Sequence, residues 1–219
     1  VNDRVGGESI AVTYCPLCGT GVAFLSPAAT GEQGFGVSGL LYNSDVLLYD
    51  RQTESLWSQL RMQAVAGPLK GQRLAAVPLI HTSWRAWRAE HPDTQVLSID
   101  TGFDRDYERD PYAGYMASSE VYFPVSASSR RYHPKERVLG LEVDGRFKAY
   151  PFAELSRSGD DEIGDSFAGR KLTIRFDPAA KSARAFDENG AEVTAVTGFW
   201  FAWYAFHPET EVYTAGRRR

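Results

Sequence analysis

Short runs in which apolar or β-branched residues alternate with polar ones follow one another along the chain, separated by turn residues. Near the C-terminus, "KLTIRF" and "SARAFD" flank "DPAAK", and "DENG" supplies the next turn, which is typical of a β-meander. "VLGLEVDGRFKAYPFAEL" predicts a hairpin with its turn at Asp144-Gly145. "FGVSGLLYNSDVLLYDRQTESLWSQL" predicts three further strands, over 35–41, 46–49 and 55–60.

Two parts of the chain are repeated. Residues 1–24 align without a gap on residues 163–186, an offset of 162 residues. "WRAWRAEHPDT" (84–94) and "WFAWYAFHPET" (200–210) are identical at seven of eleven positions, at an offset of 116 residues, and both predict a short helix that ends at His-Pro. The chain therefore reads as two copies of one module. The offsets differ by 46 residues, which indicates an insertion in the first copy.

These patterns predict an α+β, strongly β-rich fold made of two pseudo-repeats of a β-meander plus a short helix. The first repeat spans residues 1–135 and contains an inserted strand meander at about 25–75; the second spans 136–219. We expect both to pack as one compact unit. A hairpin starting at Glu136 precedes the second copy's Ile163, and no counterpart precedes Val1. We therefore expect an N-terminal hairpin to be missing and the natural protein to be longer.

Composition narrows the class of protein. Of 219 residues, 43% are hydrophobic and 13% aromatic, which suits a globular domain with a substantial core. The net charge is −4 and the 24 Lys and Arg residues are scattered, apart from three arginines at the C-terminus, which argues against a nucleic-acid surface. The chain has no apolar run long enough for a transmembrane segment and no signal-peptide pattern. Nothing indicates a nucleotide or flavin cofactor.

The only two cysteines, Cys15 and Cys18, form a CxxC pair in "VTYCPLCGTGVAF". In the second copy Asp177 and Ala180 occupy these positions, so the module folds without thiols there and a purely packing role loses weight. The repeat places the pair in a turn between two strands, whereas a thioredoxin-type CxxC opens a helix. The closer analogue is a CPxCG knuckle, in which two sulfurs and nearby backbone N–H groups face one metal ion.

Two thiolates suit soft ions, either copper as Cu(I) or zinc. Structural zinc needs about four ligands, so the others would come from a histidine or from Asp45 and Asp50. His91 and His207 are repeat equivalents with an expected structural role at a helix end, and His81 has no stronger claim. His133, which has no counterpart, is the third metal-ligand candidate. Further site candidates lie in the inserted meander: Asn43, Asp45, Asp50, Arg51, Trp57 and Gln59.

Part of this set has a simpler explanation. Turn chemistry accounts for Asn43 and Asp50, and β-sheet preference accounts for Trp57. Arg51 and Gln59 are less explained, and both stay candidates for ligand contact or for supporting the ligands.

Two alternatives to a metal site stay open. A CxxC pair can carry thiol-disulfide redox chemistry, but a strand and not a helix N-terminus precedes Cys15, so nothing local in the sequence lowers its pKa. The protein could instead be a non-catalytic interaction module, whose function would survive replacement of both cysteines. A Cys15–His133 nucleophile and base pair has no local signature, so the sequence does not decide whether the protein is an enzyme. A small ligand or a protein partner remains unidentified.

At this point the motifs carry a resemblance. "VTYCPLCGTGVAF", "FGVSGLLYNSDVLLYDRQTESLWSQ", "WRAWRAEHPDTQVLS", "RDYERDPYAGY" and "HPKERVLGLEVDGRFKAYP" together resemble the bacterial and archaeal domain-of-unknown-function family 3179, over nearly the whole chain. The resemblance implies a periplasmic, extracellular or lipid-anchored protein without an established activity. It also implies that the missing hairpin ends in Trp-His-Glu just before Val1, close to the cysteines.

Overall fold

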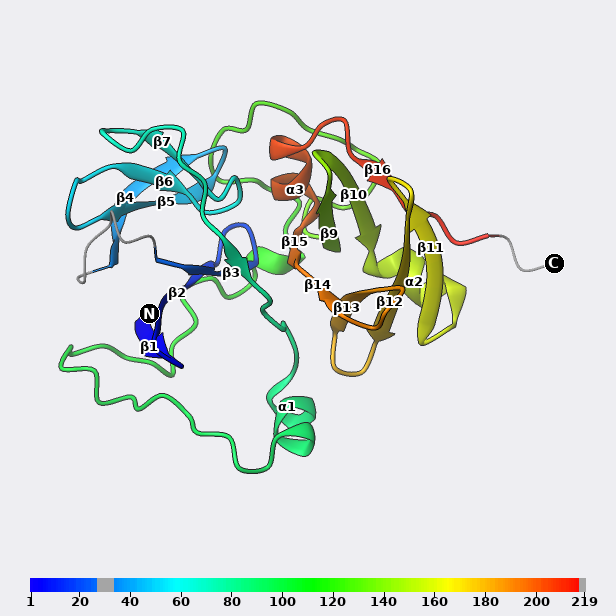
Figure 1. Cartoon of the computed structure of the whole chain (residues 1–219), viewed down its shortest axis with the longest axis horizontal. Coiled ribbons are helices and arrows are strands. Elements are labelled where there is room, and N and C mark those ends of the chain that lie inside the picture. Colours follow the sequence, from blue (N-terminus) through cyan, green and yellow to red (C-terminus); the bar gives the residue numbers. More distant parts are fainter. Residues whose placement is uncertain (27–33, 217–219) are drawn as a thin grey trace.

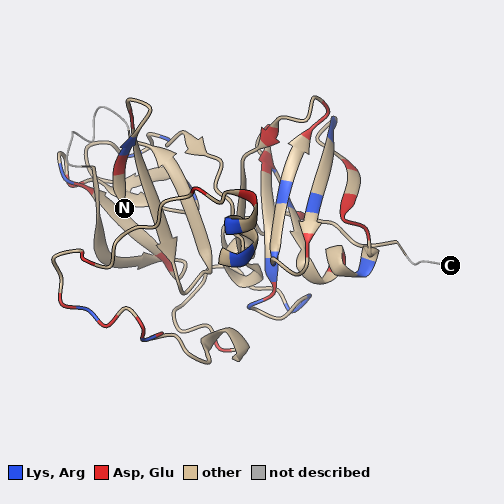
Figure 2. Ribbon diagram, turned by 90° about the horizontal axis from the view of Figure 1, so that it is seen from below, with Lys and Arg blue, Asp and Glu red and all other residues tan. Residues whose placement is uncertain are grey.

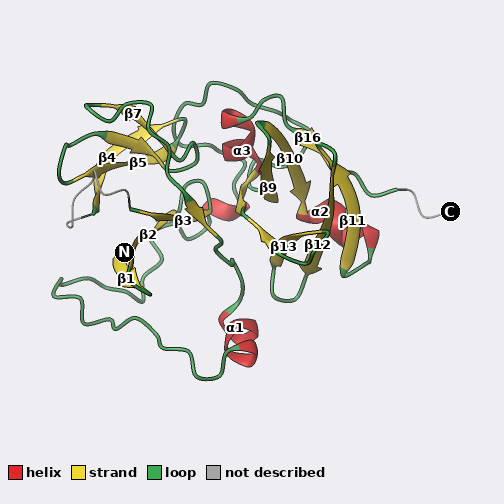
Figure 3. Cartoon of the chain, in the orientation of Figure 1, coloured by secondary structure: helices red, strands yellow, loops and turns green. Residues whose placement is uncertain are grey.

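The chain folds into a β-rich structure of four small sheets arranged in a propeller-like ring (Figure 1). The computed structural model describes residues 1–26 and 34–216, so part of the predicted insertion and the C-terminal arginines lie outside the described residues. Strands dominate and the three α-helices of the described part have seven residues each (Figure 3). The prediction of a β-rich fold is confirmed.

The first and fourth sheets match each other in strand order. The first runs β1-β2-β3-β8, with β1 (Asn2–Val5), β2 (Glu8–Cys15), β3 (Thr20–Leu25) and β8 (Ala76–Val77). The fourth runs β11-β12-β13-β14, with β11 (Glu162–Phe167), β12 (Arg170–Asp177), β13 (Ser182–Asp187) and β14 (Glu192–Val193).

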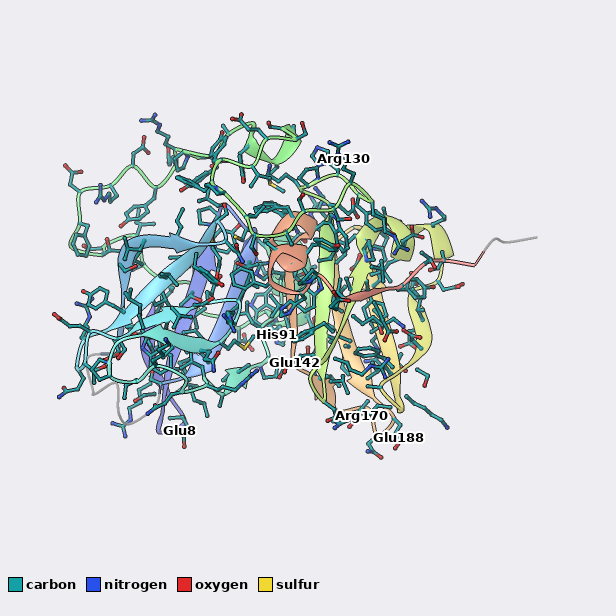
Figure 4. The ribbon with its side chains drawn as sticks, turned by 90° about the horizontal axis from the view of Figure 1, so that it is seen from above. Glu8, His91, Arg130, Glu142, Arg170 and Glu188 are labelled. Carbon is teal, nitrogen blue, oxygen red and sulfur yellow. The ribbon has the colours of Figure 1, made fainter. Side chains whose placement is uncertain are left out.

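Their register also agrees position for position. Cys15 pairs with Thr20, and Asp177 pairs with Ser182, so both pairs differ by the offset of 162 residues seen in the sequence. Glu8 and Arg170, which begin the equivalent strands β2 and β12, lie at the outer ends of their two sheets (Figure 4). The shared register is what two copies of one module require; the duplication itself stays a prediction.

The insertion forms the second sheet. Its order is β4-β5-β6-β7, with β4 (Phe35–Tyr42), β5 (Asp45–Asp50), β6 (Leu56–Ser58) and β7 (Gln63–Ala66). Asn43 and Ser44 form the turn between β4 and β5, with φ of 52° and 66°. The three predicted strands are present, and a fourth, β7, adds to them.

The third sheet is mixed. Its order is β15-β9-β10-β16, with β15 (Ala195–Phe199), β9 (Arg137–Val143), β10 (Arg146–Pro151) and β16 (Glu211–Val212), and only the β10–β16 pair is parallel. Asp144 and Gly145 both have positive φ, as the predicted two-residue hairpin turn requires.

Two helices fall where the repeated motif predicts them: α1 (Trp84–Glu90) and α3 (Trp200–Phe206). The expectation that the β9–β10 hairpin continues through Leu155 is wrong. The strand ends at Pro151, and α2 (Phe152–Ser158) begins there and stops at Gly159, whose φ is 69°. Proline before and glycine after this stretch are the signals that mark its ends.

The core falls into two clusters. One lies between the third and fourth sheets and includes Leu141, Leu155 and Ile174. The other joins the first sheet, the insertion and α3, and includes Cys18, Trp57 and Trp200. Because this second cluster collects side chains from both halves of the chain, it fixes the cysteine turn against the rest of the molecule.

The stretch between α1 and β9 has no strand, and its one short helix is the 3-10 helix η2 (Tyr115–Ala117). Figures 1 and 3 show it running as a long loop outside the sheets. Figure 2 shows acidic and basic residues interspersed along the ribbon, without a strip of one sign, so nucleic-acid binding is not indicated.

Candidate metal centre

Both cysteines sit in a turn between two strands, as the sequence predicts. Cys15 is the last residue of β2, and the turn returns through Gly19, with φ of 63°, to Thr20 at the start of β3. The thiols are free, and Cys15 and Cys18 are 2% and 0% exposed. Such a turn directs two sulfurs to one side.

A carboxylate completes a buried group with these thiols. Asp45, the first residue of β5, is 0% exposed. One ligand atom from each of Cys15, Cys18 and Asp45 lies within 4.8 Å of the others. Bonds of about 2.0–2.3 Å to one tetrahedral ion place ligand atoms roughly 3.3–3.8 Å apart. The group therefore needs only small side-chain movements to hold an ion.

Few hydrogen bonds hold this group in place. The Cys18 thiol donates to the carbonyl of Ser44 over 3.3 Å, which ties the cysteine turn to the β4–β5 turn. One carboxylate oxygen of Asp45 accepts from the backbone N–H of Leu60 over 3.0 Å. The other oxygen, Oδ1, is buried without a partner.

The electrostatics of the group separate the two thiols. The adjacent Cys18 thiol, aided by the backbone N–H groups of Cys18, Val46 and Leu17, outweighs burial and lowers the pKa of Cys15 to about 7. The same interaction between the two thiols, together with burial, raises the pKa of Cys18. Cys15 is therefore the thiol that ionises first, and N–H groups of its own turn stabilise the thiolate, as in a metal knuckle.

The surroundings of Asp45 disfavour its ionised form. Burial raises the pKa of Asp45 well above its usual value, and negative charge at Cys15 raises it further. A buried acid without a nearby cation is costly to ionise. A bound metal ion would reverse this balance by supplying the missing positive charge.

Tyr115 adds a fourth polar group from a distant part of the chain. Its hydroxyl is buried without a partner, and the side chain is 2% exposed. Burial raises the pKa of Tyr115, and charge at Cys18 and Cys15 raises it further, so the phenol lies within electrostatic range of both thiols. Among the described residues, three buried side-chain atoms lack a partner, and they belong to Ser44, Asp45 and Tyr115. Asp45 belongs to the thiol group, Ser44 precedes it in the chain, and Tyr115 lies within electrostatic range of both thiols.

Lys135 fixes the position of Tyr115. Its Nζ lies 4.0 Å from the centroid of the Tyr115 ring and donates to the carbonyls of Ser118 and Glu120. The ammonium thus clamps the η2 segment over the cysteine turn through a cation–π contact and two hydrogen bonds.

Gln59 and Asn43 support the group without joining it. Gln59 is fully buried; its Nε2 donates to Thr13 Oγ1 over 2.8 Å, and its Oε1 accepts from Thr20 Oγ1 over 2.7 Å. Asn43 Nδ2 donates to the carbonyl of Ala205 over 3.2 Å. Gln59 therefore joins the insertion to both strands beside the cysteine turn, and Asn43 joins it to the end of α3.

The other candidates of the insertion form a separate network. Asp50 accepts from Thr53 and, over 2.9 Å, from Trp57 Nε1. Burial opposes ionisation of Asp50, but these hydrogen bonds outweigh it and lower its pKa. Arg51 donates to the Tyr49 hydroxyl over 3.2 Å and is exposed. Asp50, Arg51 and Trp57 thus stabilise a turn and are not part of the thiol group.

None of the histidines belongs to the thiol group of the described residues. The Nδ1 of His133 accepts from the backbone N–H of Lys135 over 3.1 Å, so its own loop engages it. His91 and His207 close the ends of α1 and α3, where each stacks near the tryptophan four residues before it. Burial lowers the pKa of His81 to about 4, so it stays neutral at physiological pH, beside Gly21 and Tyr14.

Sequence reasoning named Asp45 among six candidates in the insertion and missed Ser44 and Tyr115. Tyr115 follows Cys18 by almost a hundred residues in a loop rich in tyrosine, and spacing gives no sign of its role. The turn signal at Asn43-Ser44 does mark the site, because its tight geometry is what puts Asp45 at the start of an inward-facing strand.

Residues 1–210 match the sequence profile of a family described as "Protein of unknown function (DUF3179)". The chain belongs to this family. Searches among curated proteins and among solved structures returned no match. The resemblance predicted from the motifs is confirmed, and in this DUF3179 chain the described residues contain no helix long and apolar enough to cross a membrane.

Proposed function

We propose that this DUF3179 protein binds a single zinc ion through Cys15, Cys18 and Asp45. The observation that carries the proposal is the convergence of three buried residues, Cys15, Cys18 and Asp45, whose ligand atoms lie within 4.8 Å of one another, while buried polar atoms of Asp45, Ser44 and Tyr115 lack partners. Buried polar groups are normally satisfied, so this concentration of exceptions needs an explanation. A metal ion provides one.

The ligand chemistry favours zinc over copper. Cu(I) selects soft thiolate and thioether ligands, whereas zinc accepts sulfur, nitrogen and carboxylate oxygen together. The carboxylate of Asp45 therefore argues for zinc. Two thiolates and one carboxylate also carry three negative charges, which a divalent ion offsets better than a monovalent one.

A fourth ligand position faces Tyr115. Three protein ligands leave one tetrahedral position, and the unpartnered phenol is the polar group within electrostatic range of both thiols. Either the phenol oxygen or a water that it hydrogen-bonds would complete the site. We propose a structural role for the ion, because the ligands are at most 2% exposed and a substrate has no direct access to them.

Such an ion would join segments that are far apart in sequence. Cys15 and Cys18 lie in the β2–β3 turn, Asp45 begins β5 in the insertion, and Tyr115 lies in the loop before β9. One metal centre would then bind the insertion and the loop to the first sheet. This matches the position of the site in the core cluster that spans both halves.

Elemental analysis of the purified protein tests the proposal. We expect about one equivalent of zinc, a loss of bound zinc in Cys15→Ser/Cys18→Ser, and a weaker site in Asp45→Asn. Asp50→Asn is the matched control, because Asp50 is equally buried in the same meander but lies outside the thiol group. Zinc that survives the double cysteine variant, or its absence after zinc-supplemented expression, contradicts the proposal.

Redox chemistry is the second candidate, favoured by the lowered pKa of Cys15, about 7, beside a second free thiol. A disulfide oxidant of the glutathione type would take two electrons and two protons from the pair, forming the Cys15–Cys18 bond and releasing two thiols. Burial argues against it, since the oxidant must reach a sulfur that is at most 2% exposed. Thiol titration under native conditions, with and without zinc, separates the two candidates.

Two broader proposals accompany this one. The equal register of the first and fourth sheets supports an origin of the chain by duplication of one module. Export to the periplasm or cell exterior, with or without a lipid anchor, rests on the family resemblance, and cell fractionation of the producing organism tests it.

A further inference from the structure

Helices α1 and α3 are local copies of each other. Trp87 Nε1 donates to Thr94 over 3.0 Å, and Trp203 Nε1 donates to Thr210 over 2.9 Å. The backbone N–H of His91 donates to the carbonyl of Trp87 in the same way as that of His207 donates to Trp203. The two helices therefore present the same arrangement of tryptophan and histidine.

Their surroundings differ completely. Five residues of α3 are buried, whereas none of α1 is. Trp200 is 1% exposed, and its equivalent Trp84 is 53% exposed. The exposure continues after the helix, where four large apolar side chains are 70–78% exposed: Val96, Leu97, Ile99 and Phe103. Large exposed apolar side chains concentrated in one short stretch are typical of an interaction site.

The β9–β10 hairpin covers the side of α3 that carries Trp203 and His207. Gly140 of β9 lies under the Trp203 ring so closely that a Cβ there would come within 2.2 Å of it. Phe147 of β10 stacks on His207 with ring centroids 3.9 Å apart. In this hairpin, Gly140 makes room for the Trp203 ring and Phe147 stacks on His207.

The strands that flank this hairpin have counterparts beside α1 that remain unpaired. β15 pairs with β9, and β16 pairs with β10. At the offset of 116 residues, β15 corresponds to residues 79–83 and β16 to residues 95–96, and neither stretch forms a strand. The backbone at Ser83, φ −77° and ψ 146°, nevertheless matches that of Phe199, φ −84° and ψ 147°. Residues 79–83 on one side and residues 95–96 on the other each present a backbone edge with which an added strand can pair.

We propose that residues 79–83, α1 and residues 95–99 form the docking site of a β-hairpin with the chemistry of β9–β10, joined to the chain on the N-terminal side of β1. The hairpin inserts between the two unpaired stretches and completes a four-stranded sheet like the third. It carries glycine opposite Trp87 and an aromatic residue opposite His91.

The spacing between β10 and β11 supports a position of the hairpin on the N-terminal side of β1. Ten residues, containing α2, separate the end of β10 from the start of β11. Since β1 is equivalent to β11, a hairpin about as far upstream of β1 reaches the α1 site by the path that β9–β10 takes to α3. This inference does not depend on the zinc proposal, because the docking site contains none of the proposed ligands.

An extended protein tests the inference. A second copy of residues 136–162 is placed directly before Val1, which reproduces the spacing of the second half. We expect hydrogen exchange of the amides of residues 79–83 to slow at least tenfold relative to the unextended chain, approaching the protection of β15. The matched control carries Gly140→Leu only in the added copy, where the larger side chain meets Trp87; it should give no protection.

Three results would overturn the proposal. Exchange of residues 79–83 could stay fast in the extended protein, or the Gly140→Leu copy could protect them equally. Concentration-dependent protection in the unextended chain, together with a dimer in sedimentation, would instead identify a second copy of the chain as the occupant. Zinc content is measured in parallel and should not change between the three proteins.

Discussion

The backbone N–H of Phe199 donates to the carbonyl of Cys18 over 2.8 Å. The repeat equivalents, Ser83 and Ala180, make the same hydrogen bond over 3.1 Å. Each half of the chain therefore holds the other by the turn between its second and third strands. Only one of these two turns carries thiols, and so the proposed metal centre sits on a contact that the fold already uses for support.

Gly19 is predicted to be intolerant of any side chain. Its φ is 63°, and a Cβ would lie 2.8 Å from the Phe199 ring. Gly19→Ala should combine backbone strain of about 1 kcal/mol with overpacking of roughly 1–3 kcal/mol, and should weaken zinc binding. Gly190 also has a positive φ, 79°, and nothing lies within 4 Å of an added Cβ, so Gly190→Ala isolates the strain. Equal thermal midpoints for the two variants would refute the packing contribution of Phe199.

The two buried aspartates of the insertion should respond to substitution with opposite signs. The folded protein raises the pKa of Asp45, so the unfolded state ionises first and stability falls as pH rises above about 4. Asp45→Asn should therefore raise the thermal midpoint of the zinc-free protein at pH 7, and this gain should vanish near pH 4. Chelator-treated samples give the measurement.

Asp50 is the counterpart of this test. The folded protein lowers the pKa of Asp50, so its carboxylate contributes stability above its usual pKa that is lost as pH falls through the lower, folded value. Asp50→Asn should destabilise the protein at pH 7, by about 1–3 kcal/mol for the weakened hydrogen bonds. A destabilised Asp45→Asn would show that its carboxylate is satisfied in the folded state.

Zinc affinity should depend on pH in a defined way. Below pH 7, Cys15 and Cys18 both carry protons that zinc must displace, because the pKa of Cys15 is about 7 and that of Cys18 is raised. Above pH 7, Cys15 is already ionised. The slope of log affinity against pH should therefore fall by about one near pH 7, measured by competition with a chromophoric chelator. A constant slope from pH 6 to 8 would rule out the lowered pKa of Cys15.

The same pKa has a consequence for stability without zinc. A folded-state pKa of about 7, against 9.0 for a free thiol, makes the Cys15 thiolate stabilising above pH 9, and this contribution is lost as pH falls through 7. Cys15→Ser should abolish that part of the pH dependence. Cys18→Ala removes the thiol that lowers the pKa of Cys15 and provides the matched comparison.

Gln59 is predicted to anchor the insertion to the first sheet. Gln59→Leu leaves the buried Thr20 hydroxyl without its acceptor and removes the donor to Thr13, which should cost about 1–3 kcal/mol. Gln52→Leu, at an exposed position of the same meander, should change the unfolding free energy by less than about 0.5 kcal/mol. Urea denaturation of both variants decides the point. A neutral Gln59→Leu would show that the hydrophobic contacts alone hold the insertion.

Local signals in the sequence were sufficient for the turns and for the strands around them. Asp144-Gly145 and Asn43-Ser44-Asp45 predict tight turns that the structure contains, and the repeat predicts the turn of the two cysteines. α2 was missed because seven residues that follow a strand without a break continue its apolar pattern. Proline and glycine at its two ends were the better guide.

The composition of the site depends on contacts between distant segments, and sequence spacing does not encode these. Asp45 meets the thiols because the β4–β5 turn packs on the β2–β3 turn, a contact between residues 26 positions apart or more. Tyr115 lies in the long loop between α1 and β9, whose sequence has no periodic pattern that would predict its position. Histidine is a common zinc ligand, but the Nδ1 of His133 accepts a hydrogen bond from the backbone N–H of Lys135. The structure does not bring His133 to the thiols.

X-ray absorption at the zinc edge of the loaded protein tests the central claim most directly. The account predicts a first shell of two sulfur atoms at about 2.3 Å and two lighter atoms at about 2.0–2.2 Å, with one light atom weakened in Asp45→Asn. A shell of nitrogen and oxygen alone, or one of four sulfur atoms, would contradict the assignment of Cys15, Cys18 and Asp45 as the ligands.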